Sequence, residues 1–305
     1  MHKKKLFVLI LVLLLLTGCT KTLKVDDKII KNEETGQTLT QNILCRPTDK
    51  NLLKIYEKYE KETKVSKLPE CNDFKANSGH DEGLWTNIFV KPLAWLIIKL
   101  GGIVKNYGLA LIIAGLAIRL LTFPLTQKTA MQSELIAKAQ PELDRIEKKY
   151  DGKDDKESML KKSQEIGLVY KKFNINPFAG CLYAFIQLPI FIAFFEGIQR
   201  VPVIFEDKFL TLNLGVTPAV ALSQGNFQYI IIIIILGLIT YFSFKFNATS
   251  SQKNPQTQIM NKSMVVMIIV MSLFMSTAID IYWLTSNSFT IVQNLLIKRR
   301  KIDVK

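Results

Sequence analysis

The sequence predicts an all-α membrane protein with five spanning helices, a charged helical hairpin and an amphipathic surface helix. Of the 305 residues, 49% are hydrophobic, and they occur in blocks. The block 226–246 carries one charge, at Lys245. Its length meets the roughly 20 residues that a helix needs to cross a bilayer. The isoleucine run would also suit a buried strand, but strands are shorter than this.

Five such blocks predict the spanning helices, and the last two are joined by a very tight turn. The predicted spans are 107–126, 177–197, 226–246, 259–276 and 279–297.

The N-terminus has the pattern of a secretory signal peptide, residues 1–18. Lys3–Lys5 form a basic start, an apolar run follows, and LTGC ends at Cys19. LTGC resembles the lipobox of bacterial lipoproteins, in which the cysteine thiol receives a diacylglycerol. An uncleaved N-terminal anchor is the alternative. In both cases the polar segment 19–83 begins outside the cytoplasm.

The distribution of charge predicts which loops face the cytoplasm. Segment 20–83 has twelve basic and twelve acidic residues, and loop 200–225 is balanced too. Loop 245–262 has three lysines and no acid, and the tail after 297 is also basic. Excess Lys and Arg marks cytoplasmic loops. Five spans therefore place 127–176, 247–258 and the C-terminus on the cytoplasmic side of a bacterial plasma membrane, and 200–225 on the outer side.

The same distribution argues against nucleic acid as the specific partner. The net charge of +14 is spread over segments that flank the membrane and is not gathered in one basic domain. The tail could still contact ribosomal RNA or anionic lipid.

The extracytoplasmic segment is predicted to contain a short charged helix over 49–68, with Leu53, Tyr56 and Tyr59 on one side. Cys45 and Cys71 flank it. Outside the cytoplasm they can form a disulfide. The disulfide would stabilise a segment that is too small to bury a large hydrophobic core. A disulfide and two free thiols both fit the sequence.

Residues 84–104 repeat apolar side chains at helical spacing, with a thin polar stripe and two tryptophans. This pattern is typical of an amphipathic helix lying on the outer surface. A sixth span would reverse all later loops and place the basic tail outside, so the charge pattern argues against it.

Residues 127–172 predict a cytoplasmic helical hairpin that turns at 151–155. Eleven basic and nine acidic residues make it highly charged. The side chains expected to face each other across the hairpin are Met131, Leu135, Ile146 and Tyr150 on one arm and Met159, Leu160, Ile166 and Tyr170 on the other.

Arg119 lies among leucines and isoleucines, roughly 18 Å into its span at about 1.5 Å per residue. In lipid it would cost on the order of 3 kcal/mol. Snorkelling to the cytoplasmic edge is one explanation. A polar groove is the other, because further polar residues lie at similar depth. Those residues are Thr122, Gln187, Asn287 and the stripe Trp283, Ser286, Thr290 and Gln293.

Three stretches together resemble the YidC/Oxa/Alb membrane protein insertases. They are RLLTFPLTQKTAMQSELIAKAQPEL, NINPFAGCLYAFIQLPIF and SNSFTIVQNLLIKRR. The resemblance covers about 84–300, and the lipobox resembles that of the lipoprotein form. Leu182-Tyr183 and MSTAIDIYW depart from the family pattern, and the second departure places Asp280 in an unusual turn.

The resemblance implies a membrane core, residues 84–305, around a hydrophilic groove that is open to the cytoplasm and to lipid. The substrates would be nascent membrane proteins, received alone, with the Sec translocon or from a ribosome. The implied groove residues are Arg119, Thr122, Gln187, Trp283, Ser286, Asn287, Thr290 and Gln293. No cofactor is expected.

The sequence also bears on other classes of protein. A transporter or channel for an anionic solute would use Arg119 as its binding site, but the chain shows no inverted repeat. The two histidines, His2 and His80, lie outside the predicted core, which argues against an enzyme or a metal site. Glu196 and Asp280 are expected to be charges at the outer interface. An adhesin would leave the spans unexplained.

Overall fold

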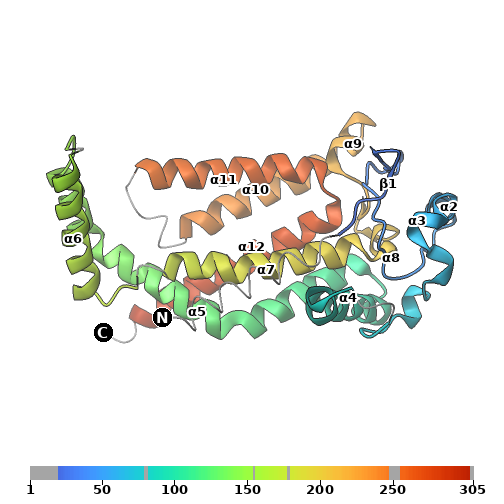
Figure 1. Cartoon of the computed structure of the whole chain (residues 1–305), viewed down its shortest axis with the longest axis horizontal. Helices are drawn as coiled ribbons and strands as arrows, with labels where there is room; N and C mark the ends of the chain where they lie inside the picture. The colour runs from blue at the N-terminus through green and yellow to red at the C-terminus, as the bar shows by residue number, and fades with distance from the viewer. Residues whose placement is uncertain (1–19, 79–81, 154, 177–178, 247–254, 303–305) are drawn as a thin grey trace. The chain divides into compact units, whose positions relative to one another are not determined.

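The computed structural model describes residues 20–78, 82–153, 155–176, 179–246 and 255–302 (Figure 1). Helices make up most of these residues, which confirms the predicted all-α class. Two antiparallel hairpins provide short strands, β1 (Lys24–Val25) with β2 (Lys28–Ile29) and β3 (Lys208–Phe209) with β4 (Leu212–Asn213). The predicted signal peptide and Cys19 lie outside the described residues.

The chain forms two compact units, and several helices pass from one to the other. Unit 1 comprises Met1–Ala117, Leu188–Leu236 and Val270–Thr285. Unit 2 comprises Ile118–Gln187, Gly237–Ile269 and Ser286–Lys305.

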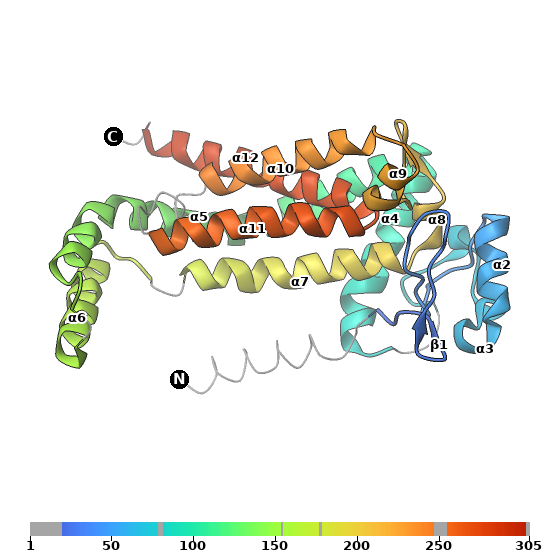
Figure 2. The same ribbon diagram turned by 90° about the horizontal axis from the view of Figure 1, so that it is seen from above.

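The N-terminal segment of unit 1 contains β1, β2, α2 (Lys50–Lys58), α3 (Glu60–Thr63) and two single turns, η1 (Val65–Lys67) and η2 (Cys71–Asp73). Figure 2 shows β1, α2 and α3 gathered together. Asp49 begins α2, because its carboxylate accepts hydrogen bonds from the N–H groups of Asn51 and Leu52.

The single helix predicted over 49–68 is wrong, because the chain leaves the helical conformation at Tyr59, with φ −114° and ψ 39°. After the break, α2 packs against a small core through one face. Leu52 and Tyr56 are buried, whereas the predicted Leu53 and Tyr59 are only partly buried. The rest of this core consists of Leu23, Leu39, Ile43 and Val65. Spacing along one continuous helix could not reveal these partners.

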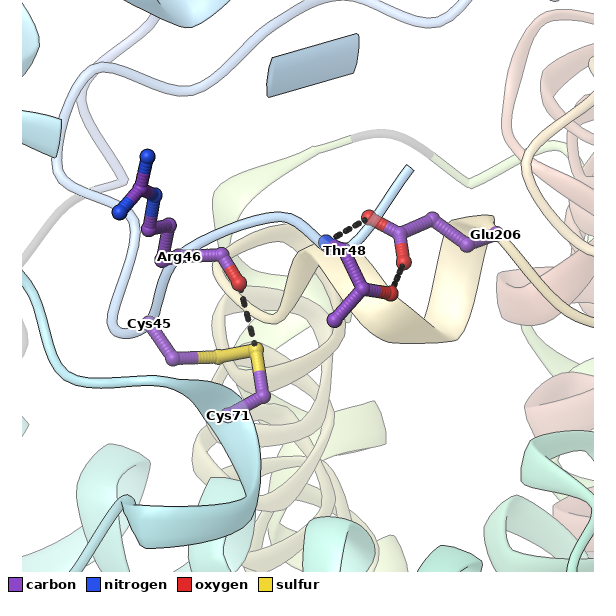
Figure 3. Close-up of a disulfide and its surroundings, with 5 residues drawn as sticks. All are labelled: Cys45, Arg46, Thr48, Cys71 and Glu206. Carbon is purple, nitrogen blue, oxygen red and sulfur yellow. Dashed lines mark hydrogen bonds between the residues drawn. A yellow bond between two sulfur atoms is a disulfide. The ribbon is translucent and has the colours of Figure 1, made fainter. Parts of the chain in front are cut away.

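Cys45 and Cys71 form a disulfide in the structure (Figure 3). Beside it, the backbone N–H of Thr48 donates to Glu206 Oε1 at 2.9 Å, and the Thr48 hydroxyl contacts the other carboxylate oxygen. The bridge thus closes the N-terminal segment on itself, and the Thr48–Glu206 contact ties it to the 200–225 loop.

Removing the disulfide is expected to loosen the N-terminal segment. The bridge joins residues separated by 26 positions. For a loop of that size, chain entropy predicts a loss of about 3–4 kcal/mol in the free energy of unfolding. Thermal unfolding of Cys45→Ser/Cys71→Ser, compared with the oxidised and reduced wild type, measures the effect. Identical unfolding of all three samples would contradict the expectation.

Arg200 is the second tie between the N-terminal segment and the 200–225 loop. It is fully buried, and its guanidinium donates to the Asn42 carbonyl at 2.7 Å and to both carboxylate oxygens of Glu82 at 2.7 Å. The backbone N–H of Leu44 donates to the Arg200 carbonyl at 2.8 Å. A buried cation in unit 1 therefore has partners on several sides.

The helix predicted over 84–104 begins with a π-helical turn, η3 (Thr86–Val90), and continues as α4 (Lys91–Val104). Thr86–Val104 is 19 residues long and is apolar enough to cross a membrane. Tyr107–Lys128 and Tyr229–Phe246 meet the same criterion, and Asn261–Phe274 is a shorter apolar helix. Length and composition do not fix which helices cross, so the surface helix and the count of five spans stay predictions.

The first arm of the predicted hairpin continues directly from the helix that carries Arg119. This helix, α5 (Tyr107–Lys149), has 43 residues and includes Pro124 and Pro141. Figures 1 and 2 show α6 (Lys156–Lys172) beside the C-terminal part of α5. Asp155 caps α6 by accepting from the Ser158 N–H at 2.8 Å.

Among the described residues, the two arms share an apolar cluster and two ion pairs, Lys149–Glu165 and Lys172–Glu142. Five of the eight predicted facing residues belong to the cluster: Leu135, Ile146, Tyr150, Ile166 and Tyr170. The prediction is wrong for Met131, Met159 and Leu160, which are exposed. The C-terminal half of α6 makes the contact, through Val169. Lys149 lies 2.5 Å from Glu165, and this hydrogen bond lowers the pKa of the Glu165 carboxyl.

Four of the remaining helices match predicted blocks. They are α7 (Ala179–Gln199), α10 (Tyr229–Phe246), α11 (Pro255–Phe274) and α12 (Thr277–Ile302). Two short helices, α8 (Pro202–Phe205) and α9 (Pro218–Ser223), lie in the 200–225 segment, for which only a loop was predicted. Only Met275 and Ser276 separate α11 from α12, in agreement with the tight turn predicted there.

Asp280 and Glu196 are buried within the protein, so neither is exposed as a charge on its surface, and their position near the outer interface stays a prediction. Asp280 lies in the first turn of α12, not in an unusual turn, and is fully buried. Glu196 is 3% exposed and accepts a hydrogen bond from the Trp85 indole at 3.1 Å. The 200–225 loop covers the start of α12, because the N–H groups of Thr277 and Ala278 donate to its carbonyls.

Candidate functional site

Arg119 is buried in unit 2 and faces α12. It is 4% exposed. Its Nε atom donates to the Ser286 hydroxyl at 3.1 Å, and its Nη2 atom contacts the same oxygen. The guanidinium therefore lies against another helix instead of extending along its own towards the end of the span. This geometry disfavours snorkelling.

A second polar pair repeats the contact two helical turns further on. Gln293 Nε2 donates to the Thr126 hydroxyl at 2.9 Å, and both residues are buried. The Arg119–Ser286 and Thr126–Gln293 pairs have the same sequence separation, 167. The step from the first pair to the second is therefore seven residues forward along both helices, so α5 and α12 run parallel here. Between the pairs, Phe123 and Phe289 meet edge to face with centroids 6.4 Å apart.

Three more of the predicted residues lie in unit 2 near these pairs in sequence. The Asn287 side-chain amide donates to the Thr240 hydroxyl of α10 at 3.0 Å. Thr122 and Thr290 donate to the carbonyls of Ile118 and Ser286, one turn back in their own helices. We call Arg119, Thr122, Thr126, Ser286, Asn287, Thr290 and Gln293 the polar seam.

Four buried polar atoms of unit 2 have no hydrogen-bond partner within the described part of the chain. Two of them belong to predicted site residues, Nη1 of Arg119 and Oε1 of Gln187 on α7, and the others are Oε1 of Gln140 and Nδ2 of Asn294. Burying a polar group without a partner costs about 1–3 kcal/mol, and more when the group is charged. The guanidinium can therefore still bind an acceptor, such as a carboxylate, a carbonyl or water.

Trp283 is the predicted site residue that belongs to unit 1. Its ring stacks on Phe191 at 5.6 Å, and Phe194 stacks on the neighbouring Tyr282 at 4.2 Å. In unit 1, Trp283 is thus part of an aromatic cluster.

The sequence prediction missed two residues of this region, Thr126 and Thr240. Thr126 could have been found, because it lies seven residues after Arg119 and four after Thr122, on the same helical face. Thr240 gave a weaker signal, as a hydroxyl in an otherwise apolar helix.

Across the described residues, no group of three or more His, Cys, Asp or Glu side chains is placed to hold a metal ion.

The Thr126–Gln293 pair offers a test of the seam's contribution to stability. Thr126→Val would leave the buried Gln293 amide without that acceptor and should lower the free energy of unfolding by about 1–3 kcal/mol. Thermal unfolding in detergent measures the loss. Adding Gln293→Leu should recover most of it, because both polar partners are then gone. A double variant as unstable as the single one would contradict this.

Comparison with known proteins identifies the family. The model of the 60Kd inner membrane protein family matches residues 99–304. The chain belongs to this family. It is 39% identical to the membrane protein insertase YidC of Oceanobacillus iheyensis, over 72% of this chain and 86% of that protein. It is 36% identical to the membrane protein insertase MisCA of Bacillus subtilis, over 76% and 86% of the two chains.

Membership in the 60Kd inner membrane protein family establishes the function in outline. The relatives are insertases, so the chain is a multi-pass protein of a bacterial membrane that inserts membrane proteins. This supports insertion and not the alternative of solute transport. Insertases are not classical enzymes, and their substrates are nascent membrane proteins.

Proposed function

We propose that the polar seam, with Gln187 and Trp283, lines a hydrophilic groove that receives the polar tails of nascent membrane proteins. The observation that carries this proposal is Arg119, a buried guanidinium that keeps one nitrogen without a partner among the described residues. Contact with water or with a substrate would compensate the cost of burying a permanent charge at this place.

The groove would lower the barrier to moving a polar tail. About 30 Å of hydrocarbon separates the two sides of a bilayer, and each unpaired backbone group in it costs several kcal/mol. A wet groove that reaches Arg119 from the cytoplasm shortens that path. Arg119 attracts acidic residues of the tail, and the seam hydroxyls and amides hydrogen-bond to its backbone. The substrate's apolar span then leaves sideways into lipid.

The rest of the chain has matching roles in this proposal. Residues 1–18 are a signal peptide, Cys19 carries a diacylglycerol, and 19–83 lies outside the cytoplasm. Residues 84–305 are the insertase core, and the 127–172 hairpin faces the cytoplasm together with the C-terminus. Work alone and work beside the Sec translocon both fit this arrangement, with the hairpin as the place where a ribosome could dock.

Site-specific crosslinking tests the path of the substrate. A photoreactive residue at position 119 or 187 should crosslink to the tail of a stalled nascent membrane protein. Ile103, which is 75% exposed on α4, is the control position. Crosslinks at 119 and 187 that are absent at 103 support the groove. Equal crosslinking at all three positions would contradict it.

A further inference from the structure

A cavity of about 590 Å³ lies in unit 1, between the N-terminal segment and the first residue of α4. Five lysines line it: Lys21, Lys61, Lys64, Lys67 and Lys91. We call it the lysine cavity. Its size is within the range of small-molecule sites, about 300–1,000 Å³. It is separate from the polar seam, and the proposed insertion step does not use it.

The charge of the lysine cavity is strongly positive. Among the described residues of the lining, the carboxylates are Glu62 and Glu82, against five lysines. Glu82 is already paired, because Arg200 donates to both of its oxygens. In the described lining the lysines thus outnumber the carboxylates, and an anion would relieve the repulsion between ammonium groups.

The walls of the lysine cavity are held by fixed contacts. Lys91 is 3% exposed. Lys21 is fixed through its backbone, since its N–H donates to Asn42 Oδ1 at 2.9 Å and its carbonyl accepts from Gln41 at 2.7 Å. Thr63, also in the wall, donates to the Tyr59 carbonyl at 2.9 Å. Binding an anion here would therefore order little additional backbone.

The position of the cavity in the chain points to the source of the anion. Lys91 belongs to the apolar helix Thr86–Val104, close to its start. Lys21 follows two residues after Cys19, the proposed site of lipid attachment. In the proposed arrangement, both walls thus adjoin segments that would contact lipid. Lysine ammonium groups bind phosphate as point charges.

We propose that the lysine cavity binds the phosphate-bearing headgroup of an anionic phospholipid. With the N-terminal segment outside the cytoplasm, as proposed above, the lipid comes from the outer leaflet. The site would fix the N-terminal segment and the start of the Thr86–Val104 helix to the membrane surface at a defined height. An acidic peptide would need an extended groove, whereas this is a compact cavity.

Titration of the full-length protein in neutral detergent tests this proposal. The probes are short-chain phosphatidylglycerol and short-chain phosphatidylcholine, with binding followed by calorimetry. Lys61→Gln/Lys67→Gln removes two exposed cavity lysines. Lys54→Gln/Lys58→Gln removes two exposed lysines that do not line the cavity. Thermal unfolding and the Cys45–Cys71 disulfide serve as checks that both variants are folded.

Wild type and the control variant should bind phosphatidylglycerol saturably and at least about 10-fold more tightly than phosphatidylcholine, whereas the cavity variant should lose about 10-fold or more in affinity. Unchanged binding by the cavity variant would overturn the proposal. Inorganic phosphate that competes as well as the lipid would reassign the cavity to free phosphate and overturn the lipid assignment. Tighter binding of an acidic peptide would overturn it in favour of a peptide site.

Discussion

Arg119→Ala should lower the insertion of substrates with acidic tails about 10- to 100-fold. A hydrogen bond to a charged group contributes about 1.5–3 kcal/mol, and each 1.4 kcal/mol changes a rate or an equilibrium about tenfold. The guanidinium is buried, and one of its nitrogens has no hydrogen-bond partner among the described residues. That nitrogen can therefore bind an acceptor of the substrate. The measurement is insertion of a reporter protein in cells depleted of their own insertase, at matched protein level.

Two controls make the Arg119 prediction specific. Lys128→Ala removes a positive charge from the same helix at an exposed position, and it should leave insertion nearly unchanged. Arg119→Glu should discriminate against acidic tails even more than Arg119→Ala, while a reporter with a neutral tail suffers less. Equal insertion of acidic and neutral reporters by all variants would refute a role for the charge.

Arg200→Ala should release the N-terminal segment from the 200–225 loop. Removing one partner of a buried ion pair costs about 3–5 kcal/mol. Arg200 is fully buried, but the Glu82 side chain is 31% exposed, so we expect the lower end of that range. Hydrogen exchange of residues 42–44, whose backbone contacts Arg200, should rise sharply.

Arg46 is the matched control, because it belongs to the same unit and also pairs with a glutamate. Its bond to Glu57 is 3.3 Å, and the two side chains are 42% and 49% exposed. Exposed pairs of this kind contribute about 0–1 kcal/mol. Arg46→Ala should therefore leave exchange at 42–44 unchanged. If both variants behaved alike, burial of Arg200 would not be what holds the segment.

Hydrophobic blocks and charge patterns predicted the helices well, because both are local properties of the sequence. The helices α10 and α12 follow from apolar runs, and the hairpin follows from charge-rich periodicity with a turn at 151–155. The errors came from contacts that are distant in sequence. The break at Tyr59 depends on the core that α2 joins. The burial of Asp280 depends on a loop some 60 residues earlier, whose carbonyls accept from Thr277 and Ala278.

For the candidate site too, local patterns were predictable from the sequence and contacts between helices were not. Spacing of three and four residues placed Ser286, Thr290 and Gln293 on one face of a helix, and depth singled out Arg119. Their pairing across two helices could not be read from one helix at a time. Thr126 was missed for that reason, although its partner Gln293 was predicted. Thr240 depends on a contact between α10 and α12.

The proposed groove requires that water reach the surroundings of Arg119 from the cytoplasm, and cysteine labelling tests this directly. Single cysteines replace Thr122 and Asn287, which are half-buried, or Leu121 and Val292, which are 76% and 53% exposed. Cys181 is changed to serine. A membrane-impermeant maleimide is added to inverted vesicles, and it reacts with the thiolate, which needs water to form.

With a wet groove, labelling should be rapid at 122 and 287 and slow at 121 and 292, because the latter two side chains would face lipid. Exposure in the protein alone predicts the reverse order, so the two outcomes cannot be confused. Labelling at 121 and 292 with none at 122 and 287 would show a dry Arg119 and contradict the groove.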